Sequence, residues 1–538
     1  IFTFAILNLS SSYINYFLTL SSQSNTSKVV DYFYFLLLLK IDRIIKSMRI
    51  STQIIYNLFA PSYCEKRLYF AYNNVKALEP GPFEQLIYKL GLRHEENYLN
   101  SIGECIDVST GRIGDRITAT KKYIADKMPV IYQGVLCEDL MVNNKSITLV
   151  GIPDFLIYEE GGYQIRDCKL ARHVDDKRHQ EIVAQIKVYG LLLEKLTGQK
   201  INKMEAVLGD NSLLDVTEVE AIQPGEILNK VVCIAEEKRA PYSPVGWSKC
   251  MGCGYRNICW DIALKNHDVA LVYGVDQGLA RFLWENGITK IGQLLDNYNE
   301  ISLARVNRPW GDGVQKVGKK ATKILMQAQA MTEKRNILIK KVDLPNFDNY
   351  VMFDLEGIPP YLDDLEKIYL WGLQVFGEKG TPFLPALAPI EKGGDYKGWE
   401  NFLKNSQKIF ENYGDIPFIH WASYEKTKIK LYLQRYGDIK GVAERVLKNL
   451  VDLCALVKKS LILAEPSYSL KVVEKVAGFK RTQEEYGGNW AIAKYIEAVE
   501  TEDQRIRKGI IEKILKYNQE DLVATWEAFK WLKKEIAK

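Results

Sequence analysis

Residues 150 to 189 constrain the fold more than any other stretch, because acidic and basic residues are set there within a strand-turn-strand pattern. The stretch begins VGIPDFLIYEEGGYQIRDCKLA, with apolar residues on both sides of Gly161-Gly162. Two consecutive glycines are typical of the tight turn that joins antiparallel strands. We therefore expect residues 152–158 and 163–170 to pair as a β-hairpin.

The charged residues of this hairpin are expected to converge on one spot. In the expected register Asp154 faces Lys169, and Asp167 shares a face with Lys169 because side chains alternate along a strand. Asp154 then lies diagonally across from Asp167, within reach of one metal ion. Solvated charges on a surface hairpin are the simpler interpretation of a single D-x-K pattern. Here the acids stand among Ile, Val, Phe and Leu, where unpaired charge is costly, so we predict a bound cation.

The order Asp154, Asp167-Cys168-Lys169, then Gln185-x-x-x-Tyr189 resembles the PD-(D/E)XK core of RecB-type nucleases, including CRISPR-associated exonucleases of that type. Gln185 and Tyr189 are four residues apart and so share one face of a helix. The resemblance implies that the two acids hold Mg²⁺ or Mn²⁺ to polarise a phosphodiester and activate water. It also implies that Lys169 orients that water or neutralises charge, and that Gln185 and Tyr189 position the nucleic-acid backbone.

His94 stands upstream of the hairpin, at the place of the metal-binding histidine of that family. The resemblance implies that it is a further metal ligand, and an imidazole in an oxygen-rich shell shifts the preference from magnesium toward manganese. A structural histidine is the alternative for any lone His.

Three of the nine cysteines fall within ten residues, as Cys250, Cys253 and Cys259, which indicates metal binding in a reducing compartment. We therefore expect a cytoplasmic protein. Three thiolates need a fourth to close a tetrahedral or cubane site. In the RecB-type nucleases that the chain resembles, one cysteine at the start of the domain and three at its end hold a [4Fe-4S] cluster, which implies Cys64 as the fourth ligand. Structural zinc is the alternative, although zinc sites more often use two C-x2-C pairs.

Residues 266–340 show apolar residues at helical spacing, with glycines where a tight turn would join short helices. This pattern looks like a helix-hairpin-helix pair, which binds phosphates through backbone amides and nearby lysines. Lys316, Lys319 and Lys320 are the lysines expected to bind nucleic acid. A small helical linker bundle is the alternative.

In residues 341–538, Asp354 and Glu356 are two apart on an expected strand, and Tyr517 and Asp521 are four apart on an expected helix. This arrangement resembles the DnaQ-type DEDDy exonucleases of the ribonuclease H-like fold. Glu425 stands where that family usually has an aspartate. The resemblance implies that the four acids hold two metal ions and that Tyr517 orients the attacking water for 3′-end hydrolysis. A degenerate fold retained for binding is the alternative.

A chain of 538 residues is too long for one core. We expect a mixed α/β protein with a non-globular leader (1–47), a PD-(D/E)XK restriction-endonuclease-like domain with an iron–sulfur staple (48–265), a small helix-hairpin-helix-like domain (266–340) and a ribonuclease H-like domain (341–538). The apolar run of the leader is too short to span a bilayer and no signal-peptide pattern is present. We therefore expect translation to start at Met48, with a membrane anchor as the alternative.

The net charge of +5, from 72 basic and 67 acidic residues, permits a nucleic-acid partner without requiring one. The whole arrangement resembles RecB-like nucleases that join these two modules. We expect a metal-dependent DNA exonuclease that acts on single strands or ends in repair, recombination or defence, without a membrane partner. The alternatives are a nucleic-acid-binding subunit of a helicase–nuclease complex with degenerate sites, and a nuclease that acts on RNA.

Overall fold

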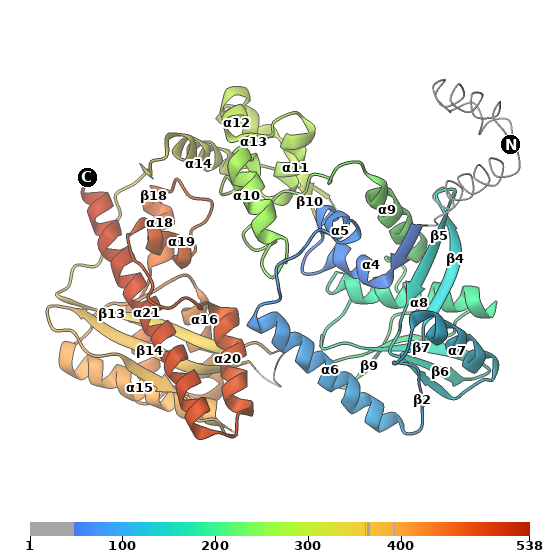
Figure 1. Cartoon of the computed structure of the whole chain (residues 1–538). Coiled ribbons are helices and arrows are strands. Elements are labelled where there is room, and N and C mark those ends of the chain that lie inside the picture. The colour runs from blue at the N-terminus through green and yellow to red at the C-terminus, as the bar shows by residue number, and fades with distance from the viewer. Residues whose placement is uncertain (1–47, 176, 312, 361, 363–365, 392) are drawn as a thin grey trace, which may run out of the picture.

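The computed structural model describes residues 48–538 except 176, 312, 361, 363–365 and 392. The predictions about the leader, residues 1–47, lie outside the described residues. An N-terminal α/β region, a helical region and a C-terminal α/β region follow one another along the chain, and the helical region lies above and between the other two in Figure 1. Among the described helices, none is long and apolar enough to cross a membrane.

The N-terminal region is built on a mixed sheet of six strands in the order β2-β3-β6-β7-β8-β9. The strands are β2 (Ile106–Asp107), β3 (Val130–Tyr132), β6 (Phe155–Glu159), β7 (Gly162–Cys168), β8 (Met204–Val207) and β9 (Leu213–Asp215). Helix α8 (Gln180–Thr197) connects the parallel strands β7 and β8 and is buried along most of its length. The crossover places one end of α8 close to the C-terminal end of β7.

A second sheet covers the other side of α8 and consists of β1 (Met48–Ser51), β5 (Lys145–Gly151) and β4 (Leu136–Val142). Helix α4 (Thr52–Phe59) packs against α8, and Ile55, Val188 and Leu192 are fully buried in the shared core. The remaining helices of this region are α5 (Glu65–Tyr72), α6 (Pro82–Ile102), α7 (Ile113–Ala125) and α9 (Pro224–Glu236).

The predicted hairpin is formed by β6 and β7, but its predicted register is wrong by two residues. Glu160 and Gly161 form the turn, each with a positive φ (52° and 82°), while Gly162 pairs with Glu159 as part of the ladder. A two-residue turn of this type needs positive φ at both central positions, and Glu160 adopts it as well. Asp154 therefore lies level with Asp167 instead of Lys169. A shift of two residues keeps every side chain on its predicted face.

The helical region contains α10 (Arg256–Asn266), η1 (Val269–Leu271), α11 (Gln277–Glu285), α12 (Ile291–Asn297), α13 (Glu300–Arg305), η2 (Gly318–Lys320) and α14 (Ala321–Glu333). Between α13 and η2 the expectation of helices is wrong, because β10 (Asn307–Trp310) and β11 (Gly313–Lys316) form an antiparallel hairpin. Pro309 removes a helical donor, and Gly311 has a φ of 57° in the turn. Lys316, at the end of β11, and Lys319 and Lys320, in η2, are exposed.

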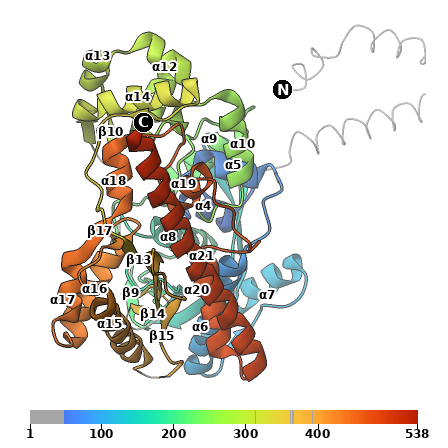
Figure 2. The same ribbon diagram turned by 90° about the vertical axis from the view of Figure 1, so that its left-hand side faces the viewer.

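The C-terminal region has a five-stranded sheet in the order β15-β14-β13-β16-β17. The strands are β13 (Asn349–Ile358), β14 (Lys367–Gly377), β15 (Leu384–Leu387), β16 (Phe418–His420) and β17 (Leu450–Asp452), and the helices are α15 (Gly394–Tyr413), α16 (Tyr424–Tyr436), α17 (Val442–Asn449), α18 (Leu453–Ser460), α19 (Leu470–Val476), α20 (Gly488–Glu500) and α21 (Gln504–Ala537). Figure 2 shows the long helix α21 running past strands β13 and β14. An aromatic cluster that includes Phe353, Trp371 and Phe402 fills the core between the sheet and α15.

The contacts that join the regions include two sets between segments far apart in sequence. Helix α20 packs against α6. The carboxylate of Glu500 forms ion pairs with Nζ of Lys89 at 2.6 Å and with Nη1 of Arg93 at 2.9 Å. Strand β12 (Ile337–Leu338) pairs with β18 (Leu461–Ile462), and Gln327 of α14 donates to the backbone oxygens of Leu463 and Glu465. Both α/β regions therefore contact neighbours that are far away in sequence.

Candidate active sites

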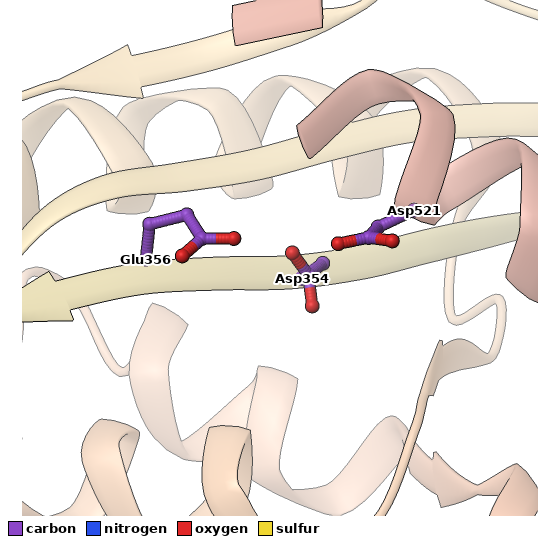
Figure 3. A group of neighbouring side chains, drawn as sticks. All are labelled: Asp354, Glu356 and Asp521. Atoms are coloured by element: carbon purple, nitrogen blue, oxygen red, sulfur yellow. The ribbon is translucent and has the colours of Figure 1, made fainter. Parts of the chain in front are cut away.

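Three acidic side chains of the C-terminal region meet at one point. Asp354 and Glu356 project from the same face of β13, and Asp521 reaches them from α21 (Figure 3). Their ligand oxygens all lie within 4.8 Å of one another, and among the described residues this is the one such group of His, Cys, Asp and Glu side chains. Asp354 is half-buried and the other two are buried. Three carboxylates at this spacing could hold a hard divalent cation.

Asn518 and Gly372 hold Asp354 in place, and neither was predicted from the sequence. Asn518 of α21 donates from Nδ2 to Oδ2 of Asp354 at 2.6 Å, while Gly372 of β14 pairs with Asp354 across the sheet. A Cβ at Gly372 would lie 1.8 Å from Oδ1 of Asn518. The absence of a side chain at Gly372 therefore makes room for Asn518. The available signal was the position of Asn518 between Tyr517 and Asp521.

The electrostatics of this group favour a bound cation. Burial is the main cause that raises the pKa of Asp354, followed by the negative charges of Asp521 and Glu356. Burial likewise raises the pKa of Glu356 and of Asp521. A divalent cation placed among carboxylates whose ionised form is disfavoured in this way would stabilise that ionised form.

Arg481 already provides one positive charge at this site. Its guanidinium forms an ion pair with Asp521 and two hydrogen bonds with Glu474, at 3.0 and 2.6 Å. The side chain is 4 % exposed, so the contact is shielded from water. Arg481 was not predicted from the sequence, since it lies in the loop between α19 and α20, away from every motif.

Glu425 and Tyr517 lie beside the three acids. Glu425 is buried and its Oε2 lies 3.1 Å from Nδ1 of His420, so it stands outside the group of three. Its charge still raises the pKa of Asp354 and Glu356. Tyr517 is buried, its hydroxyl donates to Asp521, and its ring packs edge-on against Trp490.

The second candidate site lies at the end of the β6–β7 hairpin. The backbone N–H of Asp154 donates to Oδ1 of Asp167 at 3.1 Å, and the N–H of Cys168 donates to Oδ2 of Asp154 at 2.7 Å. Lys169 places its Nζ 2.5 Å from Oδ2 of Asp167 and 3.1 Å from Oε1 of Gln185. Two carboxylates and one ammonium therefore converge, as the same-face argument predicts.

Burial and the charge of Asp167 raise the pKa of Asp154, while Lys169 opposes that rise. The pKa of Lys169 itself is raised, because the two aspartates outweigh the effect of its burial. Lys169 is therefore protonated and acts as a fixed positive charge. It cannot serve as a general base at neutral pH.

Glu95 and Gln133 complete this site and were not predicted from the sequence. Gln133 donates from Nε2 to Glu95 at 2.7 Å and to Oδ1 of Asp154 at 3.0 Å. The charge of Glu95 also raises the pKa of Asp154. The sequence signal available for Glu95 was its position next to His94 on α6.

The side chains of His94 and Tyr189 are buried, and each forms a hydrogen bond with a group other than the two aspartates. His94 is buried, with Nε2 3.1 Å from the backbone oxygen of Val207, and within the described part of the chain it joins no group of three ligand atoms. Tyr189 is buried on α8, and its hydroxyl accepts a hydrogen bond from Thr52 at 3.4 Å. A hydroxyl enclosed in this way has no free path to a nucleic-acid backbone. We therefore interpret Tyr189 as support for the lysine site.

The four predicted cysteine ligands line one small pocket with Lys66, Arg67 and Lys249. Cys64 directly precedes α5 and lies in the same pocket as Cys250, Cys253 and Cys259. Nearby, Ser62 donates to the backbone oxygen of Lys249 at 2.8 Å and joins the two segments. Burial raises the pKa of the Cys259 thiol to about 11. The segment that carries Cys64 therefore lies beside the segment that carries Cys250, Cys253 and Cys259, although the two are far apart in sequence.

Two family models match the chain. Residues 82–260 match the PD-(D/E)XK nuclease superfamily, and residues 351–533 match the RNase H superfamily. No match was found among the curated proteins. A solved structure titled "Crystal structure of SSO0001" aligns over 42 % of this chain and 95 % of its own, at 13 % identity and a TM-score of 0.23.

Each match contains the residues of one candidate site. The first spans the hairpin and α8, and the second spans the three clustered acids. The protein therefore combines a PD-(D/E)XK nuclease superfamily domain with a C-terminal RNase H superfamily domain.

Proposed function

We propose that the protein is a metal-dependent deoxyribonuclease that removes nucleotides from single strands or ends in DNA repair, recombination or defence. The observation that carries the proposal is the group of three carboxylates whose ligand atoms lie within 4.8 Å of one another. Magnesium or manganese bound there supplies charge that polarises the phosphodiester and lowers the pKa of water. Both nuclease superfamily matches support a hydrolytic reaction.

In the C-terminal domain, Asp354, Glu356 and Asp521 would hold the metal. The hydrogen bond from Asn518 fixes one oxygen of Asp354 and leaves the other free for a ligand. Tyr517 is the candidate for orienting the attacking water toward a 3′ end, and its bond to Asp521 holds its hydroxyl at the site. Glu425 would take a second metal after leaving His420.

In the N-terminal domain, Asp154 and Asp167 would hold the metal, with Glu95 as an additional acid. Lys169 stays protonated and neutralises charge that develops on the phosphate oxygens. Gln185 and Asp167 fix the position of that ammonium. His94 would serve as a ligand through Nδ1, with its Nε2–H donated to the Val207 oxygen in the way that metal-bound imidazoles are commonly oriented.

The four cysteines would hold a [4Fe-4S] cluster that joins the two ends of the N-terminal domain. The C-x2-C-x5-C pattern with one distant cysteine supports a cluster over structural zinc, because zinc sites more often use two C-x2-C pairs. Iron analysis and a visible absorption band from anaerobically purified protein test this assignment.

A second candidate function is a nucleic-acid-binding subunit that cuts only with a helicase partner. The buried ion pair between Arg481 and Asp521 favours it, since Arg481 occupies an acid that the metal needs. RNA is the alternative substrate to DNA, because the metal sites do not recognise the sugar, and both are therefore included in the assay below.

The experiment is a cleavage assay with manganese on single-stranded DNA and RNA, labelled at either end. We expect wild-type protein to shorten DNA, Asp167→Ala to remove one class of products, and Asp354→Ala to remove release from the 3′ end. Tight binding without products from any of the three proteins would favour the binding subunit.

A further inference from the structure

The β10–β11 hairpin exposes large apolar side chains on a charged region. Trp310 is 53 % exposed and Val314 is 76 % exposed. The hairpin itself is firmly seated, because Gly278 at the start of α11 lies so close that a Cβ there would come within 1.9 Å of the Pro309 oxygen. An indole exposed on a fixed support indicates a contact surface.

The Trp310 ring is held from one side by an anchored guanidinium. Arg308 shares a strand face with Trp310, and its Cζ lies 4.6 Å from the ring centroid. Arg308 is buried and pairs with Oδ2 of Asp276 at 2.8 Å and with Oε1 of Gln315 at 3.1 Å. Asp276 is itself fixed, since its Oδ1 accepts the backbone N–H of Leu279 at 3.0 Å. The exposed part of the indole is therefore presented in one orientation, which lowers the entropic cost of stacking on it.

The charge around the ring is positive. Residues 307–323 contain five basic residues and one acid, Asp312, which lies outside the described residues. Lys316, Lys319 and Lys320 are exposed, and Nζ of Lys320 lies 5.7 Å from the Trp310 centroid. A flat aromatic face beside several ammonium groups matches a base beside its phosphates.

We propose that the β10–β11 hairpin binds single-stranded nucleic acid by stacking an unpaired base on Trp310, with Lys320 contacting a flanking phosphate. The inference rests on the proposed nuclease function and names how that function holds its substrate. The interior of a duplex does not fit, because both faces of its bases are covered by their neighbours. The clustered lysines disfavour a purely apolar protein partner.

The test measures equilibrium binding of full-length protein in EDTA, where the metal sites cannot cleave. The probes are oligothymidylate, oligouridylate, a blunt duplex and an abasic strand with the same number of phosphates. We expect wild-type protein to bind the base-bearing strands more tightly than the abasic strand. Trp310→Ala should weaken binding of the base-bearing strands by about 5- to 100-fold and abolish that preference, while Trp310→Phe retains most of it.

Two matched variants control for other effects. Trp284 is also exposed in this region, at 43 %, but stacks on Tyr242 at 4.7 Å, so Trp284→Ala should leave base-dependent binding unchanged. Lys320→Ala should weaken binding of the abasic and base-bearing strands equally and reduce the salt dependence. Unchanged melting temperatures for the Trp310 variants show that the hairpin is still folded.

Wild-type protein that binds abasic and base-bearing strands equally would overturn the inference, and so would Trp310→Ala binding within twofold of wild type or a preference for duplex. Hydrolysis of thymidine 5′-monophosphate p-nitrophenyl ester, which carries one base and no flanking phosphates, is measured in parallel. Retained ester hydrolysis with no effect at Trp310 would leave the proposed nuclease function standing and reject the stacking site alone.

Discussion

Asp354 is half-buried beside Glu356 and Asp521, and burial raises the pKa of all three carboxyl groups. We predict that Asp354→Asn abolishes the C-terminal activity but stabilises the metal-free protein at neutral pH, because it removes one of three crowded negative charges. The melting temperature should rise by about 2–4 °C for each kcal/mol gained. With manganese added, the melting temperature of wild type should exceed that of Asp354→Asn, because the metal stabilises wild type more than the variant.

The pH dependence of that difference has a defined sign. A carboxyl group whose pKa is raised on folding stabilises the folded state below its unfolded pKa of about 4, and this contribution is lost as the pH rises through the folded value. The advantage of Asp354→Asn over wild type in EDTA should therefore be small in acid and grow toward neutral pH. A shrinking advantage would contradict a crowded, ionised Asp354.

We expect the contribution of Lys169 to cleavage to depend on Gln185, which holds its ammonium group in place. Lys169→Ala should lower cleavage by this site by about 10²- to 10³-fold. Gln185→Ala should cost about 10- to 100-fold, since it removes the oxygen that holds the ammonium 3.1 Å away. Both are measured as kcat in an Asp354→Ala background. Gln199→Ala, at an exposed glutamine just beyond α8, is the control, and equal losses at Gln185 and Gln199 would exclude a positioning role.

The side chains that bring charge to each site were predictable where a motif carries them, and the supporting ones were not. Asp354 and Glu356 share a face by strand periodicity alone, and so do Asp167 and Lys169. Arg481 comes from an irregular loop, and its contact with Asp521 depends on tertiary packing that no local pattern encodes. Glu425 was expected as a ligand, yet it pairs with the adjacent strand residue His420.

At the scale of elements, β13, β14 and α21 fit together through Gly372. Gly372→Ala would push a methyl group into Asn518, whose amide holds Asp354. We predict a loss of about 1–3 kcal/mol in stability and a matching loss of activity at the C-terminal site alone. Chemical denaturation and the end-labelled assay measure the two effects.

Gly509→Ala in α21 is the matched control for Gly372→Ala. Apart from the backbone of its own helix, nothing lies within 4 Å of a Cβ at Gly509, so this change should leave activity intact and stabilise the helix by roughly 0.5–1 kcal/mol. If both substitutions reduced activity equally, the loss would not arise from the contact between Gly372 and Asn518.

The elements themselves were predictable to different degrees. The β6–β7 hairpin follows from its alternating apolar residues, but its register depends on whether Glu160 or Gly162 occupies the turn, and both are compatible with the composition. The β10–β11 hairpin was missed because its few apolar residues also fit a helical spacing. Pro309 and Gly311 were the local signals against a helix.

For the whole molecule, the contact between α6 and α20 joins the two superfamily domains. Glu500 pairs with Arg93, one residue before His94 and two before Glu95, and α20 also packs against α21, the helix that carries Asp521. The two candidate sites are therefore connected through three packed helices. Surface ion pairs of this kind contribute about 1 kcal/mol or less, so the apolar packing carries most of the contact.

The cysteine pocket closes the N-terminal domain over a long separation in sequence. On the proposed cluster assignment, Cys253→Ser should remove the iron and the visible absorption band and lower the melting temperature, because loss of the cluster would free the two ends of the domain. Cys233→Ser, at an exposed cysteine outside the pocket, is the control and should keep the iron. Zinc in place of iron in the wild-type protein would contradict the cluster assignment.

Metal binding at both sites is tested most directly by anomalous scattering from crystals soaked in manganese. We expect one peak among Asp354, Glu356 and Asp521, with Arg481 displaced from Asp521, and a second peak between Asp154 and Asp167. Empty pockets at saturating manganese, with the Arg481–Asp521 ion pair intact, would contradict the claim that both domains are metal-dependent nucleases.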